Sequence, residues 1–220
     1  MARSYAHTHG IAVETEGIPI RWAPYYDPFV NLLTLGQAGR LRKLTIELSS
    51  FKPGENLLDV GCGTGSVAIA AQQQVAEATG KVAGIDPAPE MIAVAQQKAR
   101  RKGLDIDFRV GVIEALPFPD ATFDVVIASL MIHHLPSDAL QAKGFAETYR
   151  VLKPGGRLLI ADLIRSETSV GVMGLPAILM HHGMQLDAGA WLALLTKAGF
   201  SETRQLAQRF SAIGFIRARK

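Results

Sequence analysis

Between residues 56 and 162 the chain alternates short apolar runs with longer stretches of helical character. The apolar runs are NLLDV, KVAGID, IDFRVG, FDVVIASL and RLLIAD. Such runs indicate strands buried on both sides, because a strand with one exposed face carries a polar residue at every second position. The longer stretches end at glycine or at Pro-Gly-Gly, which is typical of helix ends. The alternation predicts an α/β fold in which helices cover both faces of a mostly parallel sheet.

The segments that flank this core predict a single domain, residues 1–220, without an internal repeat or a low-complexity linker. Residues 1–50 contain the aromatic cluster RWAPYYDPF and a helix from about Gly36 to Ser50, and we expect them to form a helical cap. The other parts are a cofactor-binding core over 51–162, a Met-rich substrate lid over 163–186, and a C-terminal helix with two closing strands over 187–220.

Composition narrows the class of protein. The net charge is +3, but the basic residues are scattered, which argues against a nucleic-acid partner. No apolar run approaches the roughly 20 residues of a membrane helix, and the N-terminus lacks the apolar core of a secretory signal. Cys62 is the only cysteine, so no intrachain disulfide can form. We expect a cytoplasmic protein without stable membrane insertion, and the sequence leaves both a monomer and a homodimer open.

A glycine-rich turn follows the first predicted strand. Gly61, Gly63 and Gly65 stand at alternate positions, where glycine permits a tight turn and the close approach of a ligand. The spacing differs from the dinucleotide pattern G-x-G-x-x-G, because Ser66 stands at the sixth position. The following helix has no lysine, so a phosphate-binding P-loop is also disfavoured. The turn predicts a small-molecule site at the carboxyl edge of the sheet.

An acidic residue, Asp86, ends the second predicted strand. A carboxylate at this place can accept hydrogen bonds from both hydroxyls of a ribose, and each charge-assisted bond contributes about 1.5–3 kcal/mol. The alternative is that Asp86 caps the helix that begins near PAPEMI. The glycine turn and this acid together predict a nucleoside ligand with a free ribose.

Four successive motifs resemble those of one enzyme family. They are LLDVGCGTG, GIDPAPEMI, ALPFPDATFDVVIASLMIHHL and RVLKPGGRLLIAD. These look like the motifs of the class I S-adenosylmethionine-dependent methyltransferases, in the small-molecule branch that includes the ubiquinone and menaquinone C-methyltransferases. The resemblance covers about residues 54–162. It implies a Rossmann-like, seven-stranded sheet with the last strand antiparallel, S-adenosyl-L-methionine as cofactor, and a small, partly apolar or aromatic acceptor.

The resemblance also implies which residues bind the cofactor. The glycine turn passes beneath its methionine part, Asp59 braces that turn and binds the amino group, Asp86 binds the ribose, and Met91 packs on the adenine. Bracing alone for Asp59 and ordinary core packing for Met91 are the alternatives. The full set implied for cofactor binding is Asp59, Gly61, Gly63, Gly65, Asp86, Pro87, Met91, Ile113, Glu114 and Ser129.

One position departs from the family pattern. The family often carries an acid that meets the adenine amino group where this chain has Val112. The backbone N–H of Ile113 can still bind the ring, and losing one hydrogen bond lowers affinity only about three- to tenfold. Glu114 is left open between a supporting carboxylate and a solvated surface residue.

Candidate catalytic residues lie after the fourth predicted strand and near the N-terminus. His133 and His134 stand at the ligand-binding edge, and histidine suits proton removal near neutral pH; packing or helix capping is the alternative. Tyr25 is the third candidate, because the resemblance implies an aromatic residue that closes over the cofactor, within an element that also contains Tyr26 and Asp27. We expect no metal, since the sequence has no ligand cluster at regular spacing.

A second histidine pair, His181 and His182, falls in the predicted lid, where a place in the lid surface or core is the alternative to catalysis. The chain lacks the Asn/Asp-Pro-Pro-aromatic element that base N-methyltransferases carry after the fourth strand, which argues against nucleic-acid bases as acceptors. The leading prediction is therefore an active methyltransferase with a small-molecule acceptor. A cofactor-binding sensor or scaffold without methyl transfer and a nicotinamide-dependent oxidoreductase are the alternatives.

Overall fold

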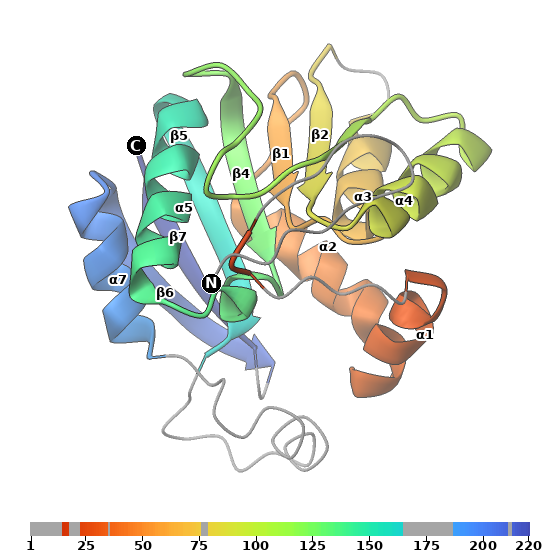
Figure 1. Ribbon diagram of the computed structural model, residues 1–220. Helices are drawn as coiled ribbons and strands as arrows, with labels where there is room; N and C mark the ends of the chain where they lie inside the picture. The colour runs from red at the N-terminus through yellow and green to blue at the C-terminus, as the bar shows by residue number, and fades with distance from the viewer. Residues whose placement is uncertain (1–14, 18–22, 35, 76–78, 165–186, 211–212) are drawn as a thin grey trace.

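A seven-stranded sheet forms the centre of the molecule (Figure 1). The computed structural model describes residues 15–17, 23–34, 36–75, 79–164, 187–210 and 213–220. The strand order is β3-β2-β1-β4-β5-β7-β6. The strands are β1 (Leu57–Val60), β2 (Val82–Asp86), β3 (Asp107–Val110), β4 (Phe123–Ser129), β5 (Leu152–Leu163), β6 (Ser201–Phe210) and β7 (Ile213–Arg219).

The sheet is mostly parallel, and only the last strand runs the other way. β1 pairs in parallel with β2 and β4, β2 with β3, and β4 with β5, whereas β7 is antiparallel to both β5 and β6. This confirms the predicted fold class. The chain order reverses at β1, which has β2 on one side and β4 on the other, and ligands of such sheets bind outside the carboxyl ends of the strands at this place.

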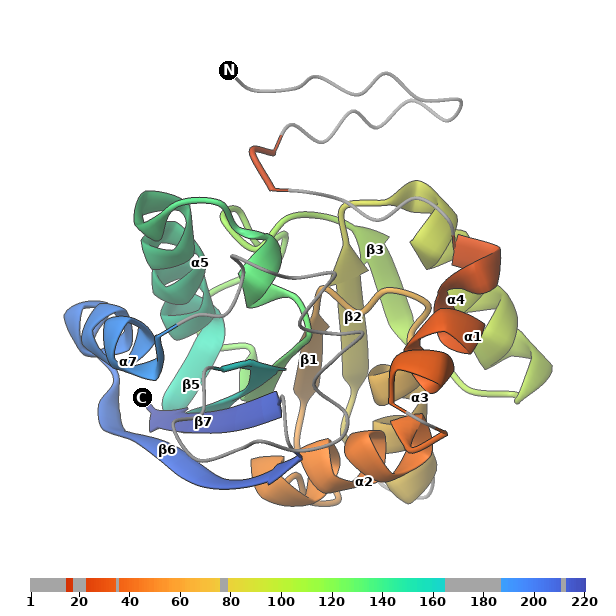
Figure 2. The ribbon, with the colours of Figure 1, turned by 90° about the horizontal axis from the view of Figure 1, so that it is seen from below.

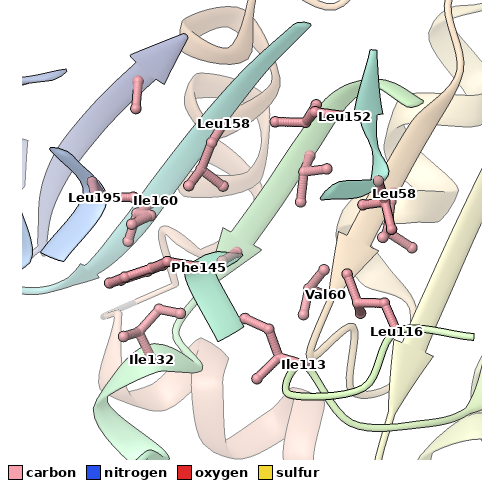
Figure 3. Packing of buried hydrophobic residues seen from close by; sticks show 14 of the residues in the cluster. Leu58, Val60, Ile113, Leu116, Ile132, Phe145, Leu152, Leu158, Ile160 and Leu195 are labelled. Atoms are coloured by element: carbon pink, nitrogen blue, oxygen red, sulfur yellow. The ribbon is translucent and has the colours of Figure 1, made fainter. Parts of the chain in front are cut away.

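Helices cover both faces of the sheet (Figure 2). The helices are α1 (Ala23–Leu33), α2 (Ala38–Ser49), α3 (Ser66–Gln74), α4 (Pro89–Arg101), the 3-10 turn η1 (Ile132–His134), α5 (Asp138–Val151) and α7 (Ala188–Lys197). Helices α2, α3 and α4 share one buried cluster with the sheet, and α5 and α7 share another on the opposite face. Figure 3 shows the second cluster, where Phe145 of α5 and Leu195 of α7 lie over Leu158 and Ile160 of β5.

The two clusters explain why the central strands have no polar face. In β4, Val125 and Ile127 belong to the cluster with α3 and α4, whereas Val126 and Ala128 belong to the cluster with α5. Alternate side chains of one strand therefore enter different cores, and both sets must be apolar. Burial on both sides is the physical cause of the apolar runs in the sequence.

Two predicted boundaries differ from the structure. Helix α3 ends at Gln74, earlier than the stretch that runs to Gly80. The predicted break at Pro154 also lies elsewhere, because α5 ends at Val151 and β5 begins at once with Leu152. The Lys-Pro-Gly-Gly stretch lies within β5 as an irregularity of register opposite β4, and Gly155 donates its N–H to the carbonyl of Lys220 at 3.0 Å.

The predicted lid and its histidines, His181 and His182, lie outside the described residues, apart from the first two lid positions. Within the described residues, no helix has the length and apolarity needed to cross a membrane.

Candidate functional site

The glycine turn connects β1 to α3 at the carboxyl edge of the sheet. All three glycines have positive φ, with +67° at Gly61 and +76° at Gly65, which confirms that the turn needs residues without a Cβ. A Cβ on Gly61 would lie 2.6 Å from the Cβ of Met131, and one on Gly65 would lie 2.6 Å from Cζ of Phe108. At these two positions the side chains of Met131 and Phe108 already lie close to the backbone, and this packing alone requires glycine.

Asp59 braces the turn from below. Its side chain is buried, and Oδ2 accepts the N–H of Ala68 in the first turns of α3 at 3.1 Å. Burial raises the pKa of Asp59 to about 7, against the lowering effect of that hydrogen bond. The bracing role of Asp59 therefore follows from contacts within the protein.

Asp86 joins the end of β2 to both the glycine turn and the start of α4. Oδ2 accepts the N–H of Gly63 and Oδ1 accepts the N–H of Ala88, each at 2.9 Å. Burial raises the pKa of Asp86 to about 6. Each carboxylate oxygen can accept a second hydrogen bond, so the Asp86 side chain combines a helix-capping contact with free acceptor capacity toward a ligand.

A cavity, called here the Asp86 cavity, opens beside this carboxylate. Pro87, Met91, Val112 and Ile113 give it apolar walls, and Asp86 supplies a carboxylate. The other lining residues are Thr15, Gly17, Tyr26, Gly61, Gly63, Ile85, Gly111, Glu114, Leu130, Met131, His134 and Leu135. The structure thus brings most of the predicted cofactor-binding residues together, and Val112 lines the wall where the family pattern has an acid.

The Asp86 cavity is narrow. Its volume is about 70 Å³, whereas ligand pockets commonly hold about 300–1,000 Å³. Glu114 contributes to this closure, because its Oε1 accepts the hydroxyl of Thr15 at 2.5 Å and so ties residues 15–17 over the cavity. Thr15 and Glu114 lie 99 positions apart in the chain, so this contact could not be predicted from the sequence.

Two adjacent tyrosines of α1 have different surroundings. The side chain of Tyr25 is 71% exposed and lines neither cavity described here, whereas Tyr26 lines both. A Cβ on Gly63 would lie 3.4 Å from Cε1 of Tyr26, so this ring lies against the glycine turn. Burial, followed by the negative charge of Asp86, raises the pKa of Tyr26 above its ordinary value. The aromatic residue at the site is therefore Tyr26, which corrects the choice of Tyr25.

A charged cluster fastens α1 to the glycine turn. Asp27 accepts hydrogen bonds from Lys98 Nζ at 2.7 Å and from the hydroxyl of Thr64 at 2.7 Å. Ser66 adds a longer bond of 3.3 Å. Although burial alone raises the pKa of Asp27, the hydrogen bond from Lys98 and the other contacts hold it below its usual value. Asp27 and Lys98 lie 71 positions apart in the chain, and the sequence alone carries no signal for this cluster.

The two histidines after β4 occupy different places. His134 lines the Asp86 cavity, and His133, which is not among the residues lining it, is 5% exposed. Nδ1 of His133 lies 2.5 Å from Oδ1 of Asp162 at the end of β5. Burial alone raises the pKa of Asp162, but the charge of His133 and the hydrogen bonds around the carboxylate hold it below its usual value. The ring centroids of the two histidines are 4.0 Å apart, so Asp162 also fixes the surroundings of His134.

Leu130 carries backbone strain between β4 and η1. Its φ is +53°, a left-handed conformation that costs a non-glycine residue on the order of 1 kcal/mol. Its N–H donates to the carbonyl of Ala161 at 2.8 Å, and the N–H of Ile132 donates to Oδ2 of Asp162 at 2.8 Å. These two hydrogen bonds to acceptors in β5 therefore hold the bend in place.

A second, larger cavity, called here the α3 groove, is lined by residues of α1, α2, α3 and the glycine turn, with Lys98 of α4 and Lys102 after it. Its volume is about 740 Å³. Tyr26, Gly61 and Leu130 line both cavities, so the groove begins where the Asp86 cavity ends. Ser129 and Asp59 line the groove and not the Asp86 cavity, Gly61 lines both, and Gly65 lines neither. No group of three or more His, Cys, Asp or Glu suited to a metal ion occurs within the described ranges.

Comparison with known proteins identifies the family. A family described as a methyltransferase domain matches residues 57–156. A demethylmenaquinone methyltransferase of Deinococcus radiodurans is 34% identical over 203 residues, which cover 88% of this chain and 81% of that enzyme. The chain belongs to the class I S-adenosylmethionine-dependent methyltransferases. The matched range 57–156 includes the glycine turn, Asp86 and the segment after β4, which border the two cavities.

Other relatives match a smaller part of their own length. A demethylmenaquinone methyltransferase of Thermus thermophilus is 37% identical over 140 residues, covering 64% of this chain and 61% of that enzyme. The matched stretch thus spans about three fifths of this methyltransferase relative. The crystal structure of a SAM dependent methyltransferase from Aquifex aeolicus has the same fold, with a TM-score of 0.67 and 24% identity over 81% of this chain and 88% of that one.

Proposed function

We propose that this methyltransferase transfers the methyl group of S-adenosylmethionine to a small aromatic acceptor of the quinone type. The observation that carries the proposal is Asp86, a buried carboxylate that ends β2, holds the glycine turn and borders a cavity with apolar walls. The demethylmenaquinone methyltransferases among its relatives support the acceptor class, as does a 2-phytyl-1,4-beta-naphthoquinone methyltransferase of Arabidopsis thaliana that is 38% identical over 154 residues.

The residues around Asp86 fit an adenosyl group. Asp86 would accept the ribose hydroxyls, Met91 and Val112 would give the base apolar walls, and the N–H of Ile113 would be a backbone donor for the ring. The narrow cavity has to widen for this. Met131 packs against Gly61 with a flexible thioether side chain, and its rotation gives the needed room without a change of fold.

The cofactor supplies a methyl group bound to a sulfonium sulfur, and loss of this methyl group leaves a neutral thioether. Tyr26 lies against the glycine turn, where its ring can face the sulfonium with a cation–π attraction of about 0.5–2 kcal/mol. His134 accepts the proton that the acceptor loses, and His133 with Asp162 holds the imidazole of His134 in position. The larger part of the rate enhancement comes from alignment of the acceptor with the methyl group.

We also infer that residues 1–220 act as one catalytic domain. The ion pair of Asp27 with Lys98, at 2.7 Å, joins α1 to α4. At the other end of the cap, Arg157 of β5 donates to the carbonyl of Ser49 and pairs with Glu55 at 2.6 Å. These contacts support a helical cap that belongs to the same unit as the core.

The test is transfer of labelled methyl from S-adenosylmethionine to naphthohydroquinone, kept reduced, with the purified chain. We expect labelled product, and we expect His134→Gln to lower kcat about 100-fold while the Kd for S-adenosylhomocysteine, measured by calorimetry, stays within about twofold. Arg100→Gln is the control, because Arg100 is exposed on α4 and lines neither cavity.

Two results would contradict the proposal. Absence of calorimetric binding of S-adenosylhomocysteine removes the cofactor assignment. Cofactor binding without transfer to naphthohydroquinone or to any member of a phenol and hydroquinone panel removes the acceptor class.

A further inference from the structure

A buried glutamine of α5 holds the segment that carries His134. Nε2 of Gln141 donates to the carbonyl of Leu135 at 3.1 Å. Oε1 of Gln141 accepts the indole N–H of Trp191 in α7 at 3.0 Å. Leu135 follows His134 directly and also lines the Asp86 cavity. One side chain therefore connects α7 to the residue next to the proposed base.

The chemistry of the two partners fixes the orientation of the Gln141 amide. An indole N–H can only donate a hydrogen bond, so the atom that faces Trp191 has to be the amide oxygen. The amide nitrogen is then left to donate to Leu135, whose carbonyl oxygen can only accept. The opposite orientation would place two donors together and two acceptors together. Trp191 thus selects the orientation in which Gln141 can hold Leu135.

Both hydrogen bonds lie inside the protein core. Leu135 and Trp191 belong to the same buried cluster as Ile132 of η1 and Phe145 of α5, which are labelled in Figure 3. A buried acceptor that loses its donor bears the full cost of its desolvation. Without the amide of Gln141, we therefore expect the backbone at Leu135 to move until its carbonyl reaches another donor.

The segment is also held on the other side of His134. The N–H of Ile132 donates to Oδ2 of Asp162 in β5 at 2.8 Å. The hydrogen bonds within the segment, such as that from the N–H of Leu135 to the carbonyl of Ile132 at 2.9 Å, maintain its shape but do not attach it to the rest of the protein. The position of His134 therefore depends on one anchor before it and on the glutamine anchor after it.

We propose that Gln141 is a positioning residue for methyl transfer, which holds the imidazole of His134 at the acceptor through Leu135, and that Trp191 sets the orientation of its amide. The inference rests on the proposed function, because it takes His134 as the group that accepts the proton. Gln141 lines neither the Asp86 cavity nor the α3 groove, so it acts without touching a ligand in either.

The first experiment measures methyl transfer to naphthohydroquinone, kept reduced, in two variants. Gln141→Met keeps the length of the side chain and removes both polar atoms. It should lower kcat about tenfold, because a displaced base loses part of its effect, while the acceptor KM and the Kd for S-adenosylhomocysteine stay within about twofold. Trp191→Phe removes only the donor to the amide and should lower kcat about threefold.

Thr148→Val is the matched control. Thr148 is a buried polar residue of the same helix, but its hydroxyl donates to the carbonyl of Gly144 within α5, at 2.8 Å. Its loss leaves the segment with His134 in place, so kcat should stay within about twofold. Urea unfolding of all three variants shows whether each is folded under the assay conditions.

A double-mutant cycle separates positioning from general damage to the protein. If Gln141 acts through His134, the double variant His134→Gln/Gln141→Met has the same kcat as His134→Gln alone, about 100-fold below the unchanged chain. A further tenfold loss in the double variant would overturn the inference, as would an unchanged kcat in folded Gln141→Met. If Gln141→Met does not fold, Trp191→Phe takes its place in the cycle.

Proton NMR decides the inference if the chain transfers no methyl group to any tested acceptor. That outcome removes the proposed function, and the position of His134 is then read from its ring. The Cε1–H resonance of His134, assigned by its loss in His134→Gln, should shift in Gln141→Met and in Trp191→Phe and stay in place in Thr148→Val. An unshifted resonance in folded Gln141→Met would show that Gln141 does not position His134.

Discussion

The Asp86 cavity and the α3 groove share three lining residues and differ in almost every other respect. The cavity holds about 70 Å³ and is built around a buried carboxylate whose two oxygens are already bonded to backbone N–H groups. The groove holds about 740 Å³, and of its basic lining residues Lys43 and Lys98 have carboxylate partners, whereas Arg42 and Lys102 have none among the described residues. The difference shows that the buried carboxylate is placed by the end of a strand, whereas the larger space arises between packed helices.

The largest expected effect is at the carboxylate of the cavity. We expect Asp86→Ala to weaken S-adenosylhomocysteine about 100-fold, because two charge-assisted hydrogen bonds to the ribose are lost. Calorimetry measures the effect.

Folding of this variant has to be checked, because Asp86 also accepts the N–H groups of Gly63 and Ala88. Asp86→Asn keeps the shape and one acceptor oxygen and serves as the second variant, with Asp105→Ala as an exposed control. An unchanged Kd for S-adenosylhomocysteine in folded Asp86→Asn would contradict a role for the Asp86 carboxylate in ribose binding.

Binding of S-adenosylhomocysteine in the Asp86 cavity should weaken about tenfold in acid. Burial raises the pKa of Asp86 to about 6, so its ionised fraction in the free protein falls about tenfold between about pH 7 and about pH 5. The Kd of S-adenosylhomocysteine should rise about tenfold over this range. An acid-insensitive Kd for S-adenosylhomocysteine would remove ionised Asp86 from ribose binding.

The Asp86 carboxyl affects folding stability in the opposite direction: acid weakens cofactor binding but increases the contribution of Asp86 to the free energy of unfolding. Because the folded-state pKa of Asp86 lies above its unfolded value of about 3.9, the folded protein holds this proton more tightly. The stabilising contribution of Asp86 is fully present below about pH 4 and is lost as the pH rises through about 6. Urea unfolding of the ligand-free chain across this range measures the change.

The smallest expected effect is on kcat/KM, when either of the neighbouring residues Tyr25 and Tyr26 is replaced by alanine. Tyr26 lines both cavities, so Tyr26→Ala should lower kcat/KM for methyl transfer about fivefold, through lost contact with the sulfonium and the acceptor. Tyr25→Ala should change kcat/KM by less than about twofold, because Tyr25 is 71% exposed. A larger loss for Tyr25→Ala than for Tyr26→Ala would show that α1 takes a different orientation in the working enzyme.

The fold and the polar centre of the cavity were predictable for the same reason. Strands buried on both sides have an unmistakable sequence pattern, and residues that end such strands, such as Asp59 and Asp86, must lie at one edge of the sheet. The choice between Tyr25 and Tyr26 could not be made in this way, because it depends on the rotation of α1 about its axis. The contacts of Asp27 with Lys98 and of His133 with Asp162 join residues far apart in the chain, and a single sequence carries no signal for such pairs.

The α3 groove was invisible in the sequence for a further reason. Its apolar residues, such as Leu41 and Ile69, are those that any amphipathic helix would carry toward a core. Only the way α1 and α2 pack over α3 leaves space between them. Sequence patterns report which faces are buried, and the amount of empty volume between packed helices is a property of the assembled chain.

The bend at Leu130 has a consequence for how this protein can change over time. Selection for folding alone would favour glycine at a left-handed position, and such a substitution would relieve the backbone. It would also delete the side chain that stands where the two cavities meet. Leu130 also packs against the buried cluster of α2, β5 and β7. We therefore expect leucine to be retained at this strained position wherever methyl transfer is selected.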